Sequence, residues 1–511
     1  MVQRAGREPA LDRAFFGHPR GLSTLFFCEM WERFSYYGMR GFLILYMTAA
    51  ASAGGLALDT ATAAAVYGTY TSMVYLMSLP GGWVADRLLG QRRAVLYGGI
   101  LIACGHFSLA FPAPRAFFLG LALIVLGTGL LKPNISVIIG QLYAPDDVRR
   151  DAAFSIFYMG INLGAFIGPL ITGYLAQSAS FRAQLAAWGL DPSSAWHWGF
   201  GAAGVGMTLG LLQYLLGAHL LGDAGMHPVL PASPELAVKT RRRAVTWLSA
   251  GTLVLLVAAG ALATGVVPVS LGQVAAAYSY LLLAVTLAFF GWLFLAGDWT
   301  PAERRRLYVI GVFFVAAALF WSVFEQAGST LNLFADRSTR NEILGYAFPS
   351  SWWQSLNALL IFVLAPAFAW LWVRLGARQP ASPTKFALGL VGVGLGFLVL
   401  IPAAQSASGG AKVGVSWLFA VYLIHTLAEL CLSPVGLSSM TTLAPARIVG
   451  LMMGVWFLGA SIGNFLGGQA ASFYEALPLS TLLGAVAALP IVAGLLMLTL
   501  RKPLTRLIDG Q

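Results

Sequence analysis

The stretch that decides the fold is Glu29-Met-Trp-Glu32-Arg33-Phe-Ser-Tyr-Tyr-Gly-Met-Arg40, which carries four ionisable side chains within twelve residues. Strongly apolar residues flank it on both sides, so the whole segment has the length and composition of a transmembrane helix. Each ionisable group at bilayer depth costs roughly 2.5–3.5 kcal/mol. At helical spacing four residues fall on one face, with Glu32 and Tyr37 beside it; the four are Glu29, Arg33, Tyr36 and Arg40. We expect this face to line a water-filled cavity or to pair with charges on other helices.

The composition is that of a polytopic membrane protein. Of the 511 residues, 58% are hydrophobic and only 10% are charged. The net charge of +11 would suit nucleic acid, but the 31 Lys and Arg residues are distributed as a topology signal. Alternate predicted loops hold 23 of them on one side and 5 on the other, and 3 lie within spans. We therefore expect no nucleic-acid partner, a location in the cytoplasmic (inner) membrane and both termini in the cytoplasm.

Hydropathy predicts an all-α protein with fourteen membrane-spanning helices. They are expected near 22–48, 59–85, 94–112, 115–143, 151–177, 198–221, 244–266, 273–296, 307–331, 349–375, 386–404, 415–440, 449–472 and 480–500. The two middle spans hold few polar residues, whereas the first six and the last six include polar and broken helices. We predict an N-terminal six-helix bundle over 1–221, a linker with two additional transmembrane helices over 222–306, and a C-terminal six-helix bundle over 307–511. Transporters are commonly built from such halves, with the substrate site near the midplane between them.

Further polar residues lie within the apolar helices of both halves. They are Lys132, Tyr158, Asn162, Trp321, Glu325, Asn357, Glu429, Ser433 and Trp456. Intramembrane charge amounts to four glutamates against three cations, so one carboxyl group lacks a partner and is a candidate proton carrier. Burial favours the neutral form of a carboxyl group and a neighbouring Arg favours the charged form, so a Glu that exchanges its Arg partner can load and release a proton. The count does not identify that Glu.

Depth along the helices predicts two ion pairs. Arg40 and Glu325 lie about equally far toward the outer end of their helices, and Lys132 and Glu429 both lie past the midpoint of helices that start outside. We expect the Arg40–Glu325 pair to close the outer side and the Lys132–Glu429 pair to close the inner side. The two pairs would form and break in alternation as the two bundles rock about the substrate site.

Five segments, from both halves of the chain, form a recognisable set. They are Glu29-x-x-Glu32-Arg33-Phe-x-Tyr-Tyr-Gly, Phe154-Ser-Ile-Phe-Tyr158-Met-Gly-Ile-Asn162-Leu-Gly, Phe320-Trp321-Ser-Val-Phe-Glu325-Gln, Glu429-Leu-Cys-Leu-Ser433-Pro-Val-Gly and Met453-Gly-Val-Trp456-Phe-Leu. The set resembles the proton-dependent oligopeptide transporter family, a branch of the major facilitator superfamily, in its bacterial form. The loop from Gly81 to Arg93 resembles the loop signature of that superfamily. One departure is Asn357-Ala358, where the family often has proline after the Asn.

The resemblance implies a major facilitator fold and proton-coupled symport of di- and tripeptides, with the proton as the coupling ion and no metal or other cofactor. Arg33 and Lys132 would hold the peptide carboxylate, and Glu429 with Asn162 and Asn357 would hold the peptide amine. The other substrate contacts that it implies are Tyr37, Arg40, Tyr75, Tyr158, Trp321, Ser433 and Trp456. Glu29, Glu32 and Arg33 would take part in proton coupling, and Arg40 with Glu325 would form the outer gate. We expect the chain to function as a monomer in the lipid bilayer.

The residues also bear on three other possible functions. A transporter of another small anion, such as nitrate, needs no carboxylate at an amine-binding end, so Glu429 favours a zwitterion. An intramembrane enzyme is disfavoured, because there is no His-Glu-x-x-His motif and the six histidines are scattered along the chain. A peptide sensor that does not transport is compatible with the same residues.

Overall fold

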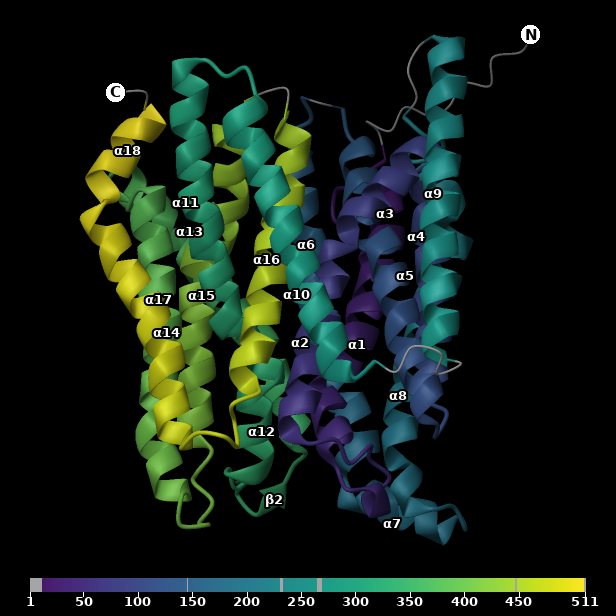
Figure 1. Ribbon diagram of the computed structural model, residues 1–511, viewed down its shortest axis with the longest axis vertical. Helices are drawn as coiled ribbons and strands as arrows, with labels where there is room; N and C mark the ends of the chain where they lie inside the picture. Colours follow the sequence, from purple (N-terminus) through teal and green to yellow (C-terminus); the bar gives the residue numbers. More distant parts are fainter. Residues whose placement is uncertain (1–11, 145, 230–232, 264–268, 446–447, 510–511) are drawn as a thin grey trace. The chain divides into compact units, whose positions relative to one another are not determined.

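Helices dominate the computed structural model of the protein (Figure 1). It describes residues 12–144, 146–229, 233–263, 269–445 and 448–509. A helix occupies each of the fourteen predicted spans. These helices are α1 (Arg20–Thr48), α2 (Thr60–Leu76), α4 (Gln91–Leu109), α5 (Pro114–Gln141), α6 (Arg149–Gln177), α8 (Ala195–Gly217), α9 (Pro234–Ala263), α10 (Leu271–Gly291), α11 (Pro301–Phe324), α13 (Trp353–Leu375), α14 (Ser382–Ala407), α15 (Ser416–Leu443), α16 (Val449–Ala471) and α17 (Leu479–Thr499). Arg4, Arg7 and Arg447, which contribute to the predicted charge asymmetry, lie outside the described residues.

Within the described residues, nine helical segments are long and apolar enough to cross a membrane by length and composition alone. The helix α1 is not among them, and it is the helix that holds the four ionisable side chains of residues 29–40. Helix α10, one of the two additional helices predicted within the linker, is among them. The chain is therefore a multi-pass α-helical membrane protein, as the composition predicts.

One predicted span is broken at a residue of the predicted gate. Hydropathy predicts a single helix over 307–331, but α11 ends at Phe324. A 3₁₀ turn (Glu325–Gly328) follows, and the chain then continues as α12 (Thr330–Arg337). The prediction of one continuous helix is therefore wrong at this point, because a hydropathy window averages the apolar residues up to Phe324 with the polar residues that follow, which begin with Glu325 and Gln326.

Local chemistry fixes the start of α11. Thr300 Oγ1 accepts a hydrogen bond from the backbone N–H of Glu303 (3.3 Å), and Glu303 Oε2 accepts one from the backbone N–H of Thr300 (2.9 Å). This reciprocal capping box satisfies two N–H groups that would otherwise lack a partner, and Pro301 at the first turn has no N–H to satisfy. The helix consequently begins before the predicted residue 307, since hydropathy does not register a polar first turn.

The predicted span 59–85 is also divided, because α2 ends at Leu76 and α3 (Ser78–Val84) begins after Met77, where Pro80 lacks the N–H that would continue the hydrogen bonds of α2. Other short elements were not predicted. They are α7 (Ala179–Ala187), α18 (Arg501–Asp509), the strands β1 (Glu342–Ile343) and β2 (Tyr346–Ala347), and a π-helical turn over Ala85–Leu89. The strands pair antiparallel, with Ile343 opposite Tyr346. The two residues between them, Leu344 and Gly345, both have positive φ angles (51° and 83°), as two-residue hairpin turns commonly require.

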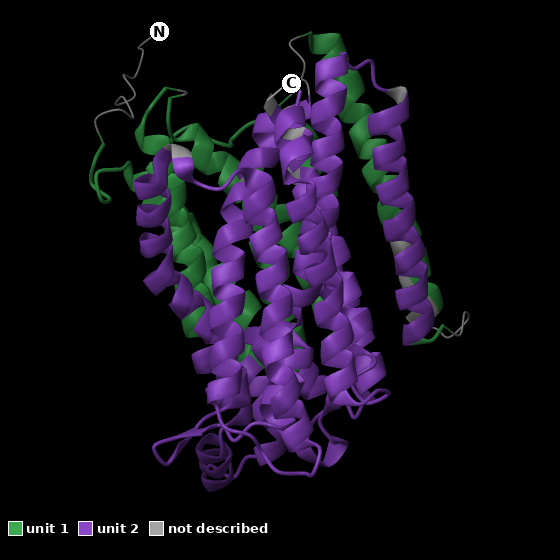
Figure 2. Ribbon diagram, turned by 90° about the vertical axis from the view of Figure 1, so that its left-hand side faces the viewer, with its two compact units in different colours: residues 1–37, 77–168, 200–270 green, residues 38–76, 169–199, 271–511 purple. Residues whose placement is uncertain are grey.

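The chain divides into two compact units, coloured separately in Figure 2. Unit 1 comprises residues 1–37, 77–168 and 200–270, and unit 2 comprises 38–76, 169–199 and 271–511. The division follows the density of contacts and runs through the helices α1, α6 and α8. It does not test the predicted domains 1–221, 222–306 and 307–511, which stay a prediction.

In unit 1, α4 and α5 pack through small residues. A Cβ atom on Gly98 of α4 would lie 2.6 Å from the carbonyl oxygen of Gly127 of α5, and one on Gly105 would lie 2.8 Å from that of Gly120. Side chains at these positions would force the two helices apart. Such close approach through glycines is typical of helix pairs in membranes, where lipid provides no hydrophobic drive for association.

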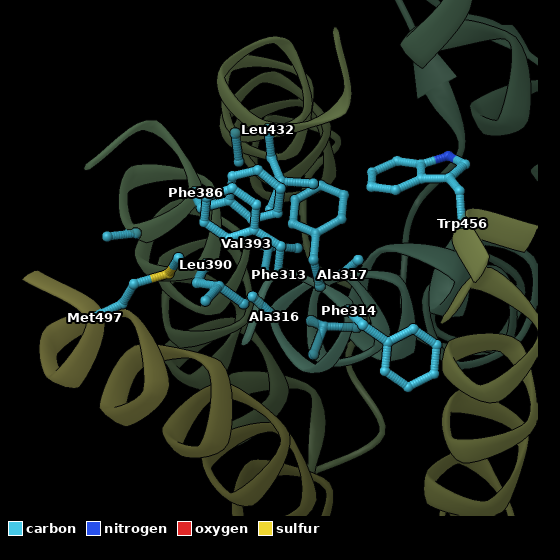
Figure 3. Packing of buried hydrophobic residues seen from close by; sticks show 14 of the residues in the cluster. Phe313, Phe314, Ala316, Ala317, Phe386, Leu390, Val393, Leu432, Trp456 and Met497 are labelled. Carbon is cyan, nitrogen blue, oxygen red and sulfur yellow. The ribbon is translucent and has the colours of Figure 1, made fainter. Parts of the chain in front are cut away.

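In unit 2, a large apolar cluster joins α11, α14, α15, α16 and α17 (Figure 3). The rings of Phe313 and Phe386 stack with their centroids 4.3 Å apart and their planes nearly parallel. The view also shows Trp456 beside Phe313, at the edge of the labelled cluster. Trp456 is thus held partly by packing, which is relevant to its predicted role as a substrate contact.

Candidate functional site

The charged face of α1 begins with a buried group of three residues in unit 1. Arg33 Nε donates a hydrogen bond to Glu32 Oε2 and lies 3.2 Å from Glu29 Oε1, so one nitrogen is within ion-pair distance of two carboxylates. All three side chains are almost completely buried, which confirms that this face does not look at lipid. Glu29 Oε2, Glu32 Oε1 and Arg33 Nη2 have no hydrogen-bond partner within the part of the chain that the structure describes.

Two tyrosines enclose the Arg33 guanidinium. Its Cζ lies 5.2 Å from the ring centroid of Tyr36 and 5.9 Å from that of Tyr37, and the two rings meet edge to face. Aromatic rings at this range attract a cation without neutralising it. Tyr37 was predicted as a substrate contact. Tyr36 was not, although its spacing of three residues from Arg33 places it on the same helix face.

Helix α6 lies directly against this part of α1. A Cβ atom on Gly164 would lie 2.9 Å from the Cβ of Arg33 and would clash with the carbonyl oxygen of Met30. Because Gly164 has no side chain, α6 can pack closely against α1 beside Arg33. The same helix carries the two substrate contacts predicted for α6, Tyr158 and Asn162. Asn162 donates from Nδ2 to the carbonyl oxygen of Tyr158 (3.0 Å), so its amide is partly engaged within its own helix.

Lys132 lies in α5 of unit 1, immediately before Pro133 within that helix, and its side chain is half-buried. Its predicted partner Glu429 belongs to unit 2. The inner ion pair between these residues therefore stays a prediction.

The second half of the charged face lies in unit 2, where Arg40 forms the predicted ion pair with Glu325. Arg40 Nη2 also donates to the backbone carbonyl of Glu325 (3.2 Å), and Arg40 Nε donates to the hydroxyl of Tyr67 in α2 (2.5 Å). All these side chains are buried. A Cβ atom on Gly328 would clash with the Tyr67 hydroxyl, so the 3₁₀ turn after α11 has to carry a glycine there. Tyr67 was missed, since nothing in its local sequence distinguishes it from a packed tyrosine.

A second buried-to-exposed network in unit 2 contains an ion pair and lies at the start of α2. Arg337 Nη1 lies 2.6 Å from Glu475 Oε1, and Thr60 Oγ1 donates to the same oxygen (2.6 Å) and accepts from Arg337 Nη2 (3.1 Å). The hydrogen bonds from Thr60 and Arg337 hold the pKa of Glu475 below its ordinary value. This network joins the start of α2, the end of α12 and the α16–α17 loop. We call this end of unit 2, which also carries the β1–β2 hairpin, the hairpin end.

Helices α2 and α16 touch backbone to backbone at the residue that follows Tyr67 in α2. A Cβ atom on Gly68 of α2 would lie 2.6 Å from the Cα of Gly468 of α16. Helices can approach this closely only where neither has a side chain at the crossing point. The backbones of α2 and α16 are therefore in direct contact at this crossing.

The predicted amine-binding residues Glu429 and Asn357 meet in unit 2. Asn357 Nδ2 lies 3.0 Å from both Glu429 Oε2 and Thr426 Oγ1. Glu429 is buried. Helix α13 runs without a break through Asn357, which agrees with the presence of Ala358 where the family often has proline. His425, one turn before Glu429, is packed and places its Nε2 3.1 Å from the carbonyl oxygen of Val393, as expected of a structural histidine.

The remaining predicted contacts in unit 2 are largely aromatic. The rings of Trp321 and Trp456 meet edge to face with centroids 6.4 Å apart, and Tyr75 lies against Phe457 at the same distance. Trp321 Nε1 is buried and has no hydrogen-bond partner within the described residues. Ser433 lies in α15, one turn beyond Glu429 and just before Pro434. The substrate roles of all these residues stay predictions.

The segment from Gly81 to Arg93 makes structural contacts. Asp86 Oδ1 accepts a hydrogen bond from Gln91 Nε2 (2.8 Å). Arg92 donates from Nε to the carbonyl oxygen of Ala224 (2.7 Å) and from Nη2 to that of Gly222 (2.5 Å). The loop thereby anchors the segment that follows α8, and it contributes no side chain to the buried charges of α1.

Comparison with known proteins gives a consistent result over nearly the whole chain. A family model described as the POT family matches residues 92–488. The chain is 42% identical to the peptide transporter YePEPT of Yersinia enterocolitica, over 98% of this chain and 97% of the relative. It is 36% identical to the di-/tripeptide transporter of Lactococcus lactis subsp. cremoris, over 97% and 98% of the two chains.

The fold agrees with solved structures of such proteins. A crystal structure of a peptide transporter POT in complex with sulfate superimposes with a TM-score of 0.88 at 41% identity, covering 98% of this chain and 99% of that one. The predicted fold class, an all-α membrane protein of the major facilitator type, is confirmed. On these similarities, the chain belongs to the POT family.

Proposed function

We propose that this protein is a proton-coupled symporter that imports di- and tripeptides by alternating access. Two relatives that align with nearly the full chain are named as a peptide transporter and a di-/tripeptide transporter. The observation that carries the proposal is the buried group of Glu29, Glu32 and Arg33 in α1. It combines a cation suited to a peptide carboxylate with two groups that can take up a proton.

The arrangement of this group suits an exchange of partners at Arg33. A guanidinium can bind a carboxylate through two parallel N–H donors, but Arg33 Nε is engaged by Glu29 and Glu32 while its buried Nη2 has no hydrogen-bond partner within the described residues. Protonation of one glutamate removes its negative charge and weakens its hold on Nε. A peptide carboxylate can then bind the guanidinium, with Lys132 as a second cation. Binding of the proton and of the peptide would thus favour each other.

At the other end of the peptide, an ammonium group requires an anion and hydrogen-bond acceptors. Glu429 supplies the anion, and Asn357 holds its Oε2 at 3.0 Å. Aromatic side chains such as Trp321 and Trp456 offer contact area without a specific polar match, which suits varied peptide side chains. Glu429 would not stabilise the binding of a simple anion such as nitrate, because both groups are negatively charged.

We assign the hairpin end of unit 2 to the external face, because the loops there belong to the set with few basic residues. The Arg40–Glu325 pair and the Gly68–Gly468 contact then close the path to the outside. The loops rich in basic residues and both termini lie in the cytoplasm, and the protein acts as a monomer in the inner membrane.

The test is uptake of labelled dialanine into proteoliposomes, with and without an inward proton gradient and with labelled nitrate as a second substrate. We expect accumulation of dialanine only with the gradient, and no accumulation of nitrate. Equal uptake of dialanine with and without the gradient would contradict proton symport. Binding of dialanine without any flux would identify a sensor instead.

A further inference from the structure

The additional helix α10 reaches the outer gate through one buried tyrosine. Most of α10 is apolar, and its role does not follow from the sequence. Tyr278 of this helix is only 3% exposed, whereas Tyr280, two residues later, is 73% exposed. Both α2 and α16 contact α10 within unit 2 (Figure 1), and Tyr278 lies at that junction.

Three hydroxyl groups meet there. The Tyr278 hydroxyl lies 2.7 Å from Ser72 Oγ of α2 and 3.4 Å from Ser461 Oγ of α16. The two serine hydroxyls lie 2.8 Å apart, and Ser461 Oγ also lies 2.9 Å from the backbone carbonyl of Ser72. Every member is buried, so each hydroxyl depends on the others for its hydrogen bonds. The Tyr278 ring adds an edge-to-face contact with Phe465 of α16, with centroids 5.6 Å apart.

The far end of α10 is fixed to a different helix. Phe290 lies against Phe314 of α11 with ring centroids 4.6 Å apart, and Phe294, in the turn that follows α10, stacks on Tyr308 of α11 at 5.5 Å. These rings tie α10 to the C-terminal helices. Of the three hydroxyls, only Ser72 belongs to the N-terminal helices. When α2 separates from α16, the bonds to Ser72 are therefore the ones that break.

We propose that Tyr278 is a positioning residue of the outer gate, through which α10 stabilises the outer-closed state of the transporter. It touches neither Arg40 nor Glu325 in any contact described above, and it acts by holding α2 on α16 beside the Gly68–Gly468 contact. This inference rests on the proposed alternating-access function. It gives one of the two additional helices a role in setting the balance between outward-open and outward-closed states.

The direct test measures that balance in the full-length protein in lipid nanodiscs. Spin labels at Ala51 and Ser408, two exposed residues at the hairpin end, report its opening as a longer distance, after the three native cysteines are replaced. Tyr278→Phe keeps the ring and removes the hydroxyl, and Tyr280→Phe is the matched control. We expect the outer-open to outer-closed ratio to rise about fivefold in Tyr278→Phe, as loss of one net hydrogen bond implies, and to stay unchanged in Tyr280→Phe.

A second pair of measurements separates a gating role from a structural one. An outward shift should lower the KM for external dialanine in Tyr278→Phe, while the maximal rate falls because return to the closed state is slower. Ser72→Ala should produce the same shift, and the double variant Tyr278→Phe/Ser72→Ala should show less than the product of the two. Ser461→Ala, which removes the third hydroxyl, replaces Tyr278→Phe if that variant does not purify as a folded protein.

An unchanged distance distribution in folded Tyr278→Phe, or an equal shift in Tyr280→Phe, would overturn the inference. The outcome is independent of the substrate. A shift in Tyr278→Phe in a protein that takes up no peptide would leave the role of α10 intact and overturn the proposed function instead.

Discussion

Arg40 and Glu325 form a buried ion pair in which the arginine also donates to the backbone carbonyl of Glu325 at 3.2 Å. The carboxylate lies at the first residue of the 3₁₀ turn that follows α11, and the arginine comes from the C-terminal half of α1. The pair thus joins helices from the two halves of the sequence, and Glu325 lies at the break between α11 and α12.

Neutralising this pair should open the gate. Glu325→Gln leaves the buried Arg40 without a counter-charge, and loss of one partner of a buried pair costs about 3–5 kcal/mol. We expect the outer-open population, measured with the Ala51 and Ser408 labels, to rise by about 100-fold or more, and gradient-driven uptake to fall. Wild-type distance distributions in folded Glu325→Gln would show that the pair does not hold the gate.

The crossing of α2 and α16 should not tolerate a methyl group. Gly68→Ala places a Cβ atom 2.6 Å from the Cα of Gly468, and the backbone there cannot yield as a flexible side chain would. Overpacking of this kind costs about 1–3 kcal/mol, all of it in the outer-closed state. We expect Gly68→Ala to favour the outer-open distance.

Gly484→Ala is the matched control for this prediction. Its new Cβ would meet only Ile401 Cδ1 at 3.7 Å, an ordinary contact. Similar distance distributions in the two glycine variants would mean that the α2–α16 contact is not tight in the closed state.

Arg33 should not be replaceable by lysine. Lys keeps the charge but offers a point cation in place of the planar fork of donors. We expect Arg33→Lys to raise the KM for dialanine by about 10- to 100-fold, which corresponds to the roughly 1.5–3 kcal/mol of a hydrogen bond to a charged group. The measurement is uptake as a function of dialanine concentration. An unchanged KM would remove Arg33 from the peptide site.

The hairpin end should lose stability in acid through Glu475. Thr60 and Arg337 hold the pKa of this carboxyl below its ordinary value of 4.5, so its contribution is present above that value and is lost as the pH falls through the lowered pKa. The pair is partly exposed, so the effect should be well under 1 kcal/mol. We expect Glu475→Gln to have a lower Tm than the wild type at pH 7 and the same Tm at the acid end of the titration. A Tm difference that does not change with pH would contradict this account.

The sequence was informative wherever a residue is costly in lipid. Glu29, Arg33 and Arg40 had to be buried against partners, and the Arg40–Glu325 pair followed from depth alone. The sequence did not indicate which buried hydroxyl groups form hydrogen bonds with one another. Serine and tyrosine are common in transmembrane helices, and only the tertiary structure shows that Ser72, Ser461 and Tyr278 meet. For the same reason the sequence did not single out Tyr67, whose hydroxyl accepts a hydrogen bond from Arg40 Nε.

Helix ends were predicted less well than helix centres. The break after Phe324 was missed because hydropathy averages over a window, in which the long apolar run of α11 outweighs the short polar stretch over residues 325–330. Arg337 was recognised only as a loop cation, since its partners Thr60 and Glu475 are far away in sequence. The Lys132–Glu429 pair stays a prediction that charge-swapped variants can test.

The most direct test of the central claim, that Glu29, Glu32 and Arg33 couple the proton to the peptide, compares two transport modes in Glu29→Gln and Glu32→Gln. Gradient-driven uptake requires a proton to load and unload, whereas counterflow exchange of labelled for unlabelled dialanine requires only the peptide site. We predict that at least one of the two variants loses gradient-driven uptake and retains counterflow. Gradient-driven accumulation at the wild-type level in both variants and in the double variant would contradict the claim.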